Sequence, residues 1–218
     1  METAGLFETL QEFGVIPVIA IDSPEGAVPL ADALIEGGLP VAEITFRTAA
    51  AAEVIARIKK ERPQLILGAG TVLTLDNLKL ARDCGAEFGV APGLNPEIVQ
   101  AAQQFDLPFI PGVVTPSEIE SAFKLGARFL KFFPAEASGG VSMIKALAAP
   151  YAHLGIKFMP TGGVSLANLK DYLALDTVAM VGGTWIASKD TIRAENWIEI
   201  RRNCQQACEL VARIRNQL

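Results

Sequence analysis

Short apolar runs alternate with longer amphipathic segments from one end of the chain to the other. The runs are too short, and too rich in β-branched and aromatic residues, to be helices. Continuous rather than alternating apolar runs are typical of parallel strands that are covered on both faces. The eight runs are Val15–Ala20, Val41–Phe46, Leu65–Leu67, Glu87–Val90, Pro108–Ile110, Arg128–Phe132, Ile156–Met159 and Val178–Val181.

Helix signals fall between these runs. Ser23 and Asn95 each precede a proline and a glutamate, a pattern typical of a helix start. Thr115 begins a similar stretch that also fits a capping box. Gly85 and Gly126 each end a predicted helix just before a strand. Strand and helix are therefore expected to alternate eight times along the chain.

Eight strand–helix repeats predict an α/β fold, a single (β/α)8 TIM barrel over residues 1–218. Parallel neighbours need right-handed crossovers, and eight such units close into a barrel at the small end of its size range. Residues 3–13 are expected to form an extra N-terminal helix that covers the barrel bottom. Trp197–Leu218 is expected to be the closing helix.

Composition narrows the class of protein. Half of the 218 residues are hydrophobic and 20% are charged, which supports a large core and excludes disorder. The formal net charge is −5 and no basic stripe is visible, so we expect no nucleic-acid partner. No apolar run is long enough to span a membrane, and the N-terminal segment lacks the pattern of a signal peptide. We therefore expect a cytoplasmic protein.

Metal and cofactor signals are weak. Cys84, Cys204 and Cys208 are too few and too uneven for a disulfide framework, and no second ligand pair accompanies the last two. No cluster of His, Asp, Glu and Cys has ligand spacing, and GAGTVL lacks the third glycine of a dinucleotide fingerprint. We expect no metal, no cofactor and reduced thiols.

Lys131 is the most informative of the residues at the predicted strand ends, where a barrel of this kind has its active site. It stands inside Phe129–Phe133, where a structural strand would carry an apolar side chain. An unpaired ammonium is costly to bury, so a lysine there tends to be neutral, and a neutral amine attacks carbonyls. The alternative is a lysine whose stem lies along apolar surface with its head in solvent.

Glu43 interrupts Val41–Phe46 in the same way and is the leading candidate for a catalytic base. Schiff-base aldolases must move protons beside the imine and at the hydroxyl of the cleaved bond. His153, the only histidine, precedes predicted strand seven and so lies at the wrong end of the barrel. The alternative for Glu43 is a structural ion pair, for example with Arg47.

Candidate anion-binding residues follow other strands. A guanidinium binds a carboxylate in bidentate fashion, so Arg47 with Thr71 would suit a 2-oxo acid, although Arg47 could equally be a solvated helix-start residue. Glycine pairs at 162–163 and 182–183 are predicted to follow strands seven and eight, the usual phosphate position in this barrel. Tight turns also use glycine, so that signal is weaker.

Seven motifs stand in order between about Val15 and Trp185: AEITFRT, GAGTVL, APGLNP, PGVVTPSE, KFFPAE, PTGGV and VGGTW. They resemble the family of 2-keto-3-deoxy-6-phosphogluconate (KDPG) and 4-hydroxy-2-oxoglutarate (KHG) aldolases. The resemblance implies a homotrimeric class I aldolase of the Entner–Doudoroff route that releases pyruvate from a small, phosphorylated 2-oxo acid. It assigns the Schiff base to Lys131 and proton transfer to Glu43. Arg47 and Thr71 would bind the substrate carboxylate, and Pro92 and Phe133 would line the pocket. The phosphate would be bound by Gly162, Gly163, Gly182 and Gly183.

Two positions depart from the family's pattern. Ala91 and Thr184 stand where serine is common; Thr184 keeps a hydroxyl for the phosphate end but adds a methyl group, which bears on the preferred aldehyde. KFFPAE favours the gluconate type over the 2-keto-3-deoxy-6-phosphogalactonate aldolases. Two other hypotheses for the function are a sugar-phosphate isomerase or epimerase that uses Glu43 alone, and a non-catalytic barrel that binds a phosphorylated ligand. Fold alone does not separate them.

Overall fold

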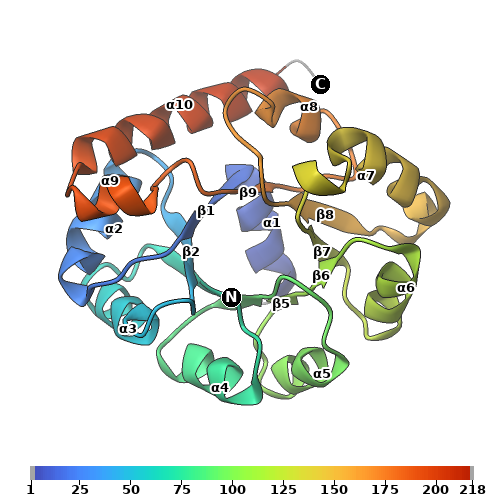
Figure 1. The fold of residues 1–218 in the computed structure, drawn as a ribbon, viewed down its shortest axis with the longest axis horizontal. Helices are drawn as coiled ribbons and strands as arrows, with labels where there is room; N and C mark the ends of the chain where they lie inside the picture. The colour runs from blue at the N-terminus through green and yellow to red at the C-terminus, as the bar shows by residue number, and fades with distance from the viewer. Residues whose placement is uncertain (1–2, 217–218) are drawn as a thin grey trace.

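The computed structural model describes residues 3–216 and has the predicted (β/α)8 barrel architecture, with parallel strands in a central ring and helices around it (Figure 1). The extra N-terminal helix, α1 (Thr3–Phe13), lies at the centre of the ring in this view. Most strand residues are buried on both faces, as the continuous apolar runs predict. The strands are β1 (Val15–Ile19), β2 (Val41–Thr45), β3 (Ile66–Gly70), β4 (Phe88–Val90), β5 (Phe109–Ile110), β6 (Gly112–Val113), β7 (Phe129–Phe132), β8 (Lys157–Pro160) and β9 (Val181–Gly183).

Several helices begin at the predicted signals. Ser23, however, caps a 3-10 turn at Pro24–Gly26, and the helix itself begins at Ala27. The predicted closing helix Trp197–Leu218 is observed over Trp197–Arg215, and residues 217 and 218 lie outside the described residues. Thr115 closes a capping box with Glu118 at the start of α6, and the Asn95 side chain accepts a hydrogen bond from the Glu97 N–H at the start of α5. The helices are α2 (Ala27–Glu36), α3 (Ala51–Glu61), α4 (Leu75–Asp83), α5 (Pro96–Gln104), α6 (Pro116–Lys124), α7 (Gly140–Ala148), α8 (Leu169–Leu173), α9 (Lys189–Arg193) and α10 (Trp197–Arg215), with 3-10 turns η1 (Pro24–Gly26), η2 (Glu136–Ser138) and η3 (Ala149–Leu154).

Barrel strand five is broken at Pro111, which separates β5 from β6. Proline has no N–H to donate to the ladder, but the Pro111 carbonyl still accepts a hydrogen bond from the Lys131 N–H at 2.8 Å. The break divides the strands into a sheet of six, ordered β5-β4-β3-β2-β1-β9, and a sheet of three, ordered β6-β7-β8. A parallel bridge between Thr161 and Gly182 joins the two sheets on the far side.

Two of the predicted strand positions are wrong at their ends. Barrel strand eight was predicted over Val178–Val181, but β9 is Val181–Gly183, and Val178 forms only an isolated bridge to Phe158. Gly182 and Gly183 are predicted to follow the strand, yet they pair with Ile16 and Pro17, because residues without side chains allow the neighbouring strand to approach closely. Likewise β3 extends to Gly70, so Gly68–Gly70 lie in the strand rather than after it.

The N-terminal end of the barrel is covered by α1. The Phe7 ring stacks on Phe129 of β7, with centroids 4.3 Å apart. At the end of α10, Arg215 donates hydrogen bonds to the Gln11 and Glu12 carbonyls of α1. None of the helices in residues 3–216 has the length and apolar character needed to cross a membrane.

Candidate active site

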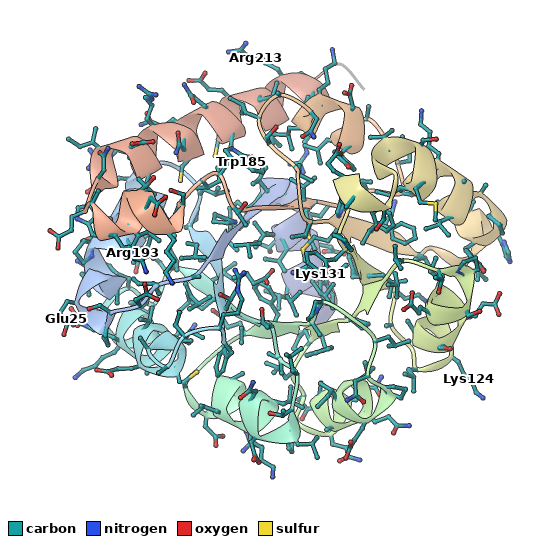
Figure 2. All side chains as sticks on the ribbon, viewed as in Figure 1. Glu25, Lys124, Lys131, Trp185, Arg193 and Arg213 are labelled. Carbon is teal, nitrogen blue, oxygen red and sulfur yellow. The ribbon has the colours of Figure 1, made fainter. Side chains whose placement is uncertain are left out.

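Lys131 and Glu43 meet inside the barrel, although 88 residues separate them in the chain. Lys131 is on β7 and Glu43 is on β2; they are 5% and 0% exposed. Lys131 Nζ lies 3.2 Å from Glu43 Oε1. Figure 2 shows Lys131 in the middle of the ring, whereas Lys124 and Arg213 project from the outer helices. The lysine is therefore not the solvent-exposed alternative, and the partner of Glu43 is Lys131 rather than Arg47.

The carboxylate of Glu43 is only half satisfied. Oε2 is buried and has no hydrogen-bond partner among the described residues. A buried carboxylate oxygen without a partner is costly, and such groups are found at catalytic or ligand-binding positions. Oε2 is thus free to accept a proton or a hydrogen bond from a bound molecule.

Gly70 makes room for Glu43, a role that sequence reasoning missed. The two strands run side by side with Glu43 opposite Gly68 and Thr45 opposite Gly70. A side chain at Gly70 would overlap the Glu43 carboxyl group, with Cγ and Cδ only 2.7 and 2.8 Å from the new Cβ. The signal that could have revealed this role is a glycine at the end of a strand whose neighbouring strand carries a buried acid.

Arg47 is held at the rim by β2. Its Nε donates to Thr45 Oγ1 at 3.1 Å, and the buried Thr45 hydroxyl donates in turn to the Ile19 carbonyl at 3.0 Å. Among the described residues, no carboxylate lies within 4.0 Å of the Arg47 guanidinium, so its terminal nitrogens can bind a ligand carboxylate. Thr45, which was not predicted, orients this arginine.

Thr71 follows β3 and adopts a left-handed backbone with φ of 58°. A β-branched residue is strained in this region, and such strain persists where the surroundings enforce it, commonly at binding sites. The next residue, Val72, is tied to β4 by an N–H bond to the Val90 carbonyl. The turn thus keeps Thr71 at the C-terminal end of β3.

Pro92 and Phe133 follow β4 and β7. Gly112 of β6 lies so close to Pro92 that a side chain at 112 would overlap the Pro92 carbonyl. The Phe133 ring centroid is 5.7 Å from Lys131 Nζ, and the residue is 37% exposed. A half-exposed aromatic ring beside a buried amine forms a wall that limits access of water.

Gly162 and Gly163 follow β8, as predicted, with φ of 98° and 82°. Their carbonyls accept hydrogen bonds from the Glu136 N–H and the Asn168 side chain, but neither of their own N–H groups donates to the described residues. Two adjacent free N–H groups in a left-handed turn form an anion-binding concavity. This loop is suited to a phosphate.

Gly182 and Gly183 do not form such a loop, because both lie within β9 and are buried. A side chain at Gly182 would overlap Thr161, and one at Gly183 would overlap the Trp185 ring. Their first role is therefore close packing at the seam between β8 and β9. Thr184 comes directly after the strand and is exposed, so it lies at the same end of the barrel as Gly162 and Gly163.

Other potential nucleophiles and ligands do not join this cluster. Burial raises the pKa of Cys84 to about 11 and that of Cys204 to about 12, so both stay as unreactive thiols. His153 is in η3, before β8, at the opposite end of the barrel, as predicted. Within residues 3–216, no three His, Cys, Asp or Glu side chains are grouped as metal ligands.

Comparison with known proteins connects this geometry to a family. The family model of KDPG and KHG aldolases matches residues 6–203. A 2-dehydro-3-deoxy-phosphogluconate aldolase of Haemophilus influenzae is 48% identical over 209 residues, which cover 96% of this chain and 98% of that protein. A KHG/KDPG aldolase of Escherichia coli is 43% identical over 195 residues, covering 89% and 91% of the two chains.

Solved structures give the same result. The chain is similar to the KDPG aldolase of Legionella pneumophila, with a TM-score of 0.89 and 38% identity over 95% of this chain and 98% of that one. That crystal structure holds pyruvate captured at low pH as a covalent carbinolamine intermediate. A carbinolamine is the adduct that an amine forms with a ketone before water leaves.

Proposed function

The chain belongs to the KDPG and KHG aldolase family, and on that premise we propose that it is a class I aldolase whose Schiff base forms on Lys131. Its substrate is a phosphorylated 2-oxo acid, KDPG, which it cleaves to pyruvate and glyceraldehyde 3-phosphate. The observation that carries this function is the buried pair of Lys131 Nζ and Glu43 Oε1 at 3.2 Å, with Glu43 Oε2 unpartnered among residues 3–216.

The substrate is oriented at its two charged ends. Arg47, fixed by Thr45, binds the carboxylate together with Thr71. The free N–H groups of Gly162 and Gly163, with Thr184, bind the phosphate at the seam of β8 and β9. The 2-oxo carbon then lies between these ends, over the Lys131 amine.

Glu43 first accepts a proton from Lys131, because a neutral amine is needed for attack. Nζ adds to the carbonyl carbon and gives a carbinolamine, and loss of water from this adduct gives an iminium ion. The carboxyl group of Glu43 can supply the proton with which the hydroxyl leaves as water.

The iminium then withdraws the electron pair of the bond between carbons three and four. Glu43 accepts the proton of the carbon-four hydroxyl as that bond breaks, which releases the aldehyde and leaves an enamine. The same proton passes to carbon three, and water hydrolyses the imine to free pyruvate and the lysine. The water lost at the start is regained at the end.

Reductive trapping tests this function. Incubation with pyruvate and borohydride should add the three-carbon unit to wild-type protein, at a peptide that contains Lys131, and mass spectrometry identifies the site. The Lys131→Ala variant should gain no adduct and lose KDPG cleavage at least about 10⁴-fold, while thermal melting shows that the fold survives.

Lys157→Ala is the matched control, because Lys157 begins the neighbouring strand β8 at the opposite end of the barrel and donates to the Asp176 carbonyl. This variant should still form the adduct. A wild-type protein that forms no adduct, or an adduct that remains in Lys131→Ala, would refute the Schiff base. It would favour an isomerase or epimerase that uses Glu43 alone, or a barrel that only binds ligands.

The KHG reaction is a second candidate, because the family model names both activities and a 43% identical relative is named KHG/KDPG aldolase. KHG shares the 2-oxo acid and the carbon-four hydroxyl with KDPG but yields glyoxylate. Comparing kcat/KM for KDPG and KHG ranks the two aldehydes, and comparing KDPG with its galactonate epimer measures the preference for the configuration at carbon four. Thr184, where related chains commonly carry serine, is the residue to exchange if KHG is preferred.

We also propose that residues 1–218 make one aldolase domain and that the protein is a cytoplasmic homotrimer. Free Cys84, Cys204 and Cys208 suit a reducing compartment. The trimer rests on the resemblance to the family. Light scattering behind size-exclusion chromatography gives the mass of the assembly, and a mass other than that of three chains would refute it.

A further inference from the structure

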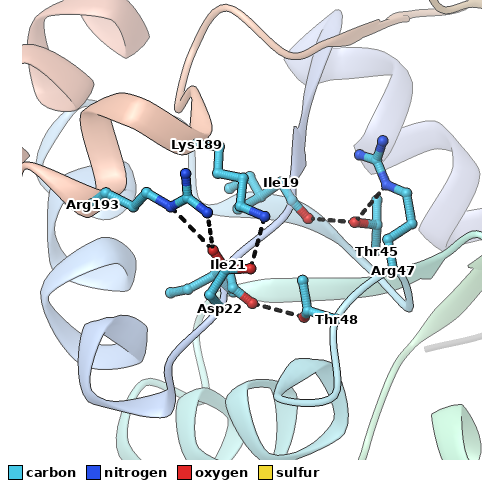
Figure 3. Close-up of polar contacts among 8 residues, drawn as sticks. All are labelled: Ile19, Ile21, Asp22, Thr45, Arg47, Thr48, Lys189 and Arg193. Atoms are coloured by element: carbon cyan, nitrogen blue, oxygen red, sulfur yellow. Dashed lines mark hydrogen bonds and ion pairs between the residues drawn. The ribbon is translucent and has the colours of Figure 1, made fainter.

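A charged cluster lies at the rim of the barrel, outside the site described so far (Figure 3). Asp22, which follows β1, accepts from Lys189 at 2.8 Å and from two nitrogens of Arg193 at 2.9 and 3.2 Å. Lys189 and Arg193 are the first and last residues of α9, the short helix that comes after β9. The cluster thus holds two cations and one anion.

This cluster is next to the candidate active site on two sides. Thr48 donates a hydrogen bond at 2.7 Å to the carbonyl of Ile21, the residue before Asp22, and Arg47 precedes Thr48. On the other side, α9 follows Thr184 in the same connection after β9. Figure 3 shows Arg47, Thr48, Lys189 and Arg193 around the ends of β1 and β2.

None of the described residues assigned so far to the phosphate of the proposed substrate is a cation. Gly162, Gly163 and Thr184 contribute N–H groups and a hydroxyl, none of which is charged, and Arg47 is assigned to the carboxylate. A phosphate monoester carries a charge of about −1.5 to −2 at neutral pH. The whole chain has a net charge of −5, which repels such a group unless cations are concentrated near the mouth.

We propose that Lys189 and Arg193 determine specificity for an aldehyde with an anionic distal group, and that Asp22 fixes both cations at the rim. The inference rests on the proposed function and names residues that act on the phosphate at longer range than Gly162 and Gly163. Asp22, Lys189 and Arg193 together carry one net positive charge. Asp190, the neighbouring acid on α9, is in an ion pair with neither Lys189 nor Arg193, which both pair with Asp22. Fixed side chains also lose less rotamer freedom when the substrate binds.

The test compares two aldehydes in the synthetic direction. Pyruvate is added to glyceraldehyde 3-phosphate or to unphosphorylated glyceraldehyde by wild-type protein and by Lys189→Gln/Arg193→Gln. The double variant should raise the KM for glyceraldehyde 3-phosphate by about three- to tenfold, the range of two exposed charge interactions. The KM for glyceraldehyde and the kcat for both should change by less than about twofold.

Salt and a compensating variant separate charge from structure. At about 1 M salt, exposed charges are screened beyond about 3 Å, so wild type and double variant should converge. Adding Asp22→Asn to the double variant removes the unpaired anion and should lower the KM for the phosphorylated aldehyde part of the way back. Lys60→Gln/Lys124→Gln makes the same change in net charge at the opposite end of the barrel, near the ends of α3 and α6, and should leave both KM values unchanged.

The inference is wrong if both aldehydes are affected equally, if the Lys60/Lys124 control gives the same rise, or if the rise persists at high salt. Borohydride trapping of pyruvate on the same variants separates this failure from that of the proposed function, because trapping involves no aldehyde. A normal adduct with unchanged aldehyde preference overturns only the role of Lys189 and Arg193. A wild-type protein without an adduct overturns both proposals.

Discussion

The two ends of strand β7 perform opposite tasks. Phe129, where the strand begins, stacks on Phe7 of the N-terminal helix α1. Lys131, two residues further along the same face, pairs with Glu43. At the N-terminal end, apolar side chains fill the barrel. A cavity of about 440 Å³ remains beside α1 and is lined by Phe7, Phe109 and Phe129, among other residues. At the C-terminal end, the same strands carry the buried Lys131 and the Glu43 carboxylate, of which one oxygen has no partner among the described residues. Thr71, with a left-handed backbone, follows β3 at this end.

The barrel therefore separates stability from chemistry along its axis. Burial and aromatic stacking at the N-terminal end stabilise the fold without touching the substrate. Groups at the C-terminal end carry a cost in folding, because buried charge and strained backbone are unfavourable unless a ligand uses them. Four substitutions test this separation of the two ends.

Glu43→Gln should lower kcat for KDPG cleavage by about 10²- to 10⁴-fold, because the amide cannot accept the proton that Oε1 and Oε2 accept. Borohydride trapping of pyruvate should be partly retained, since Lys131 is still present. Glu87→Gln is the counterpart at the N-terminal end, where Glu87 pairs with Lys59 at 2.8 Å; its kcat should stay within twofold of wild type. Near-normal activity of Glu43→Gln would remove this residue from the mechanism.

Gly70→Ala should lower kcat on the order of 10²-fold, because the new methyl group displaces the Glu43 carboxyl from Lys131 and a shift of about 1 Å has an effect of that size. Steady-state kinetics on folded protein measures the loss. Gly93→Ala is the matched control: nothing lies within 4 Å of the added carbon, so activity should be unchanged. Equal effects of the two substitutions would contradict the role of Gly70.

Phe7→Ala should lower the free energy of unfolding by about 1–3 kcal/mol, less than for a fully buried phenylalanine, because Phe7 is only partly buried. Urea unfolding measures this change. The kcat and KM for KDPG should remain within twofold of wild type, since α1 covers the end away from Lys131. A larger effect on kinetics than on stability would show that the two ends are coupled.

Asp22→Asn should have the smallest effect, and one that depends on pH. The hydrogen bond from Lys189, together with Arg193, holds the pKa of Asp22 below its ordinary value of 3.8. A carboxyl group whose pKa is lowered in the folded state stabilises the protein above its ordinary pKa, and this contribution is lost as pH falls through the lowered value. The Tm difference between wild type and variant should be present at pH 7 and should shrink as the pH falls below the ordinary carboxyl pKa of 3.8 and through the lowered value. A difference that does not change with pH would contradict the ion pair.

The sequence alone predicts the barrel, because eight apolar runs and their helix caps repeat a signal that each unit carries locally. It also selects Lys131 and Glu43 as candidate catalytic residues, since charged residues inside strands are conspicuous. It does not predict the end of β9, where Gly182 and Gly183 have no apolar side chain to mark a strand and are positioned by Thr161 and Trp185. The sequence also does not predict the ion pairs of Asp22 with α9, because these residues are far apart in the chain and meet only when β1 and β9 are neighbours.

The break at Pro111 has a consequence for the order of folding. Glu43 lies in the six-stranded sheet and Lys131 in the three-stranded one, so the base and the amine meet only when the two sheets come together. Contacts between residues far apart in sequence form late, because they must overcome the entropy of closing a long loop. A chain that has assembled only its first strands holds the base without a nucleophile. During refolding, activity should therefore return later than the helical circular dichroism signal. The time at which activity returns reports when the two sheets come together.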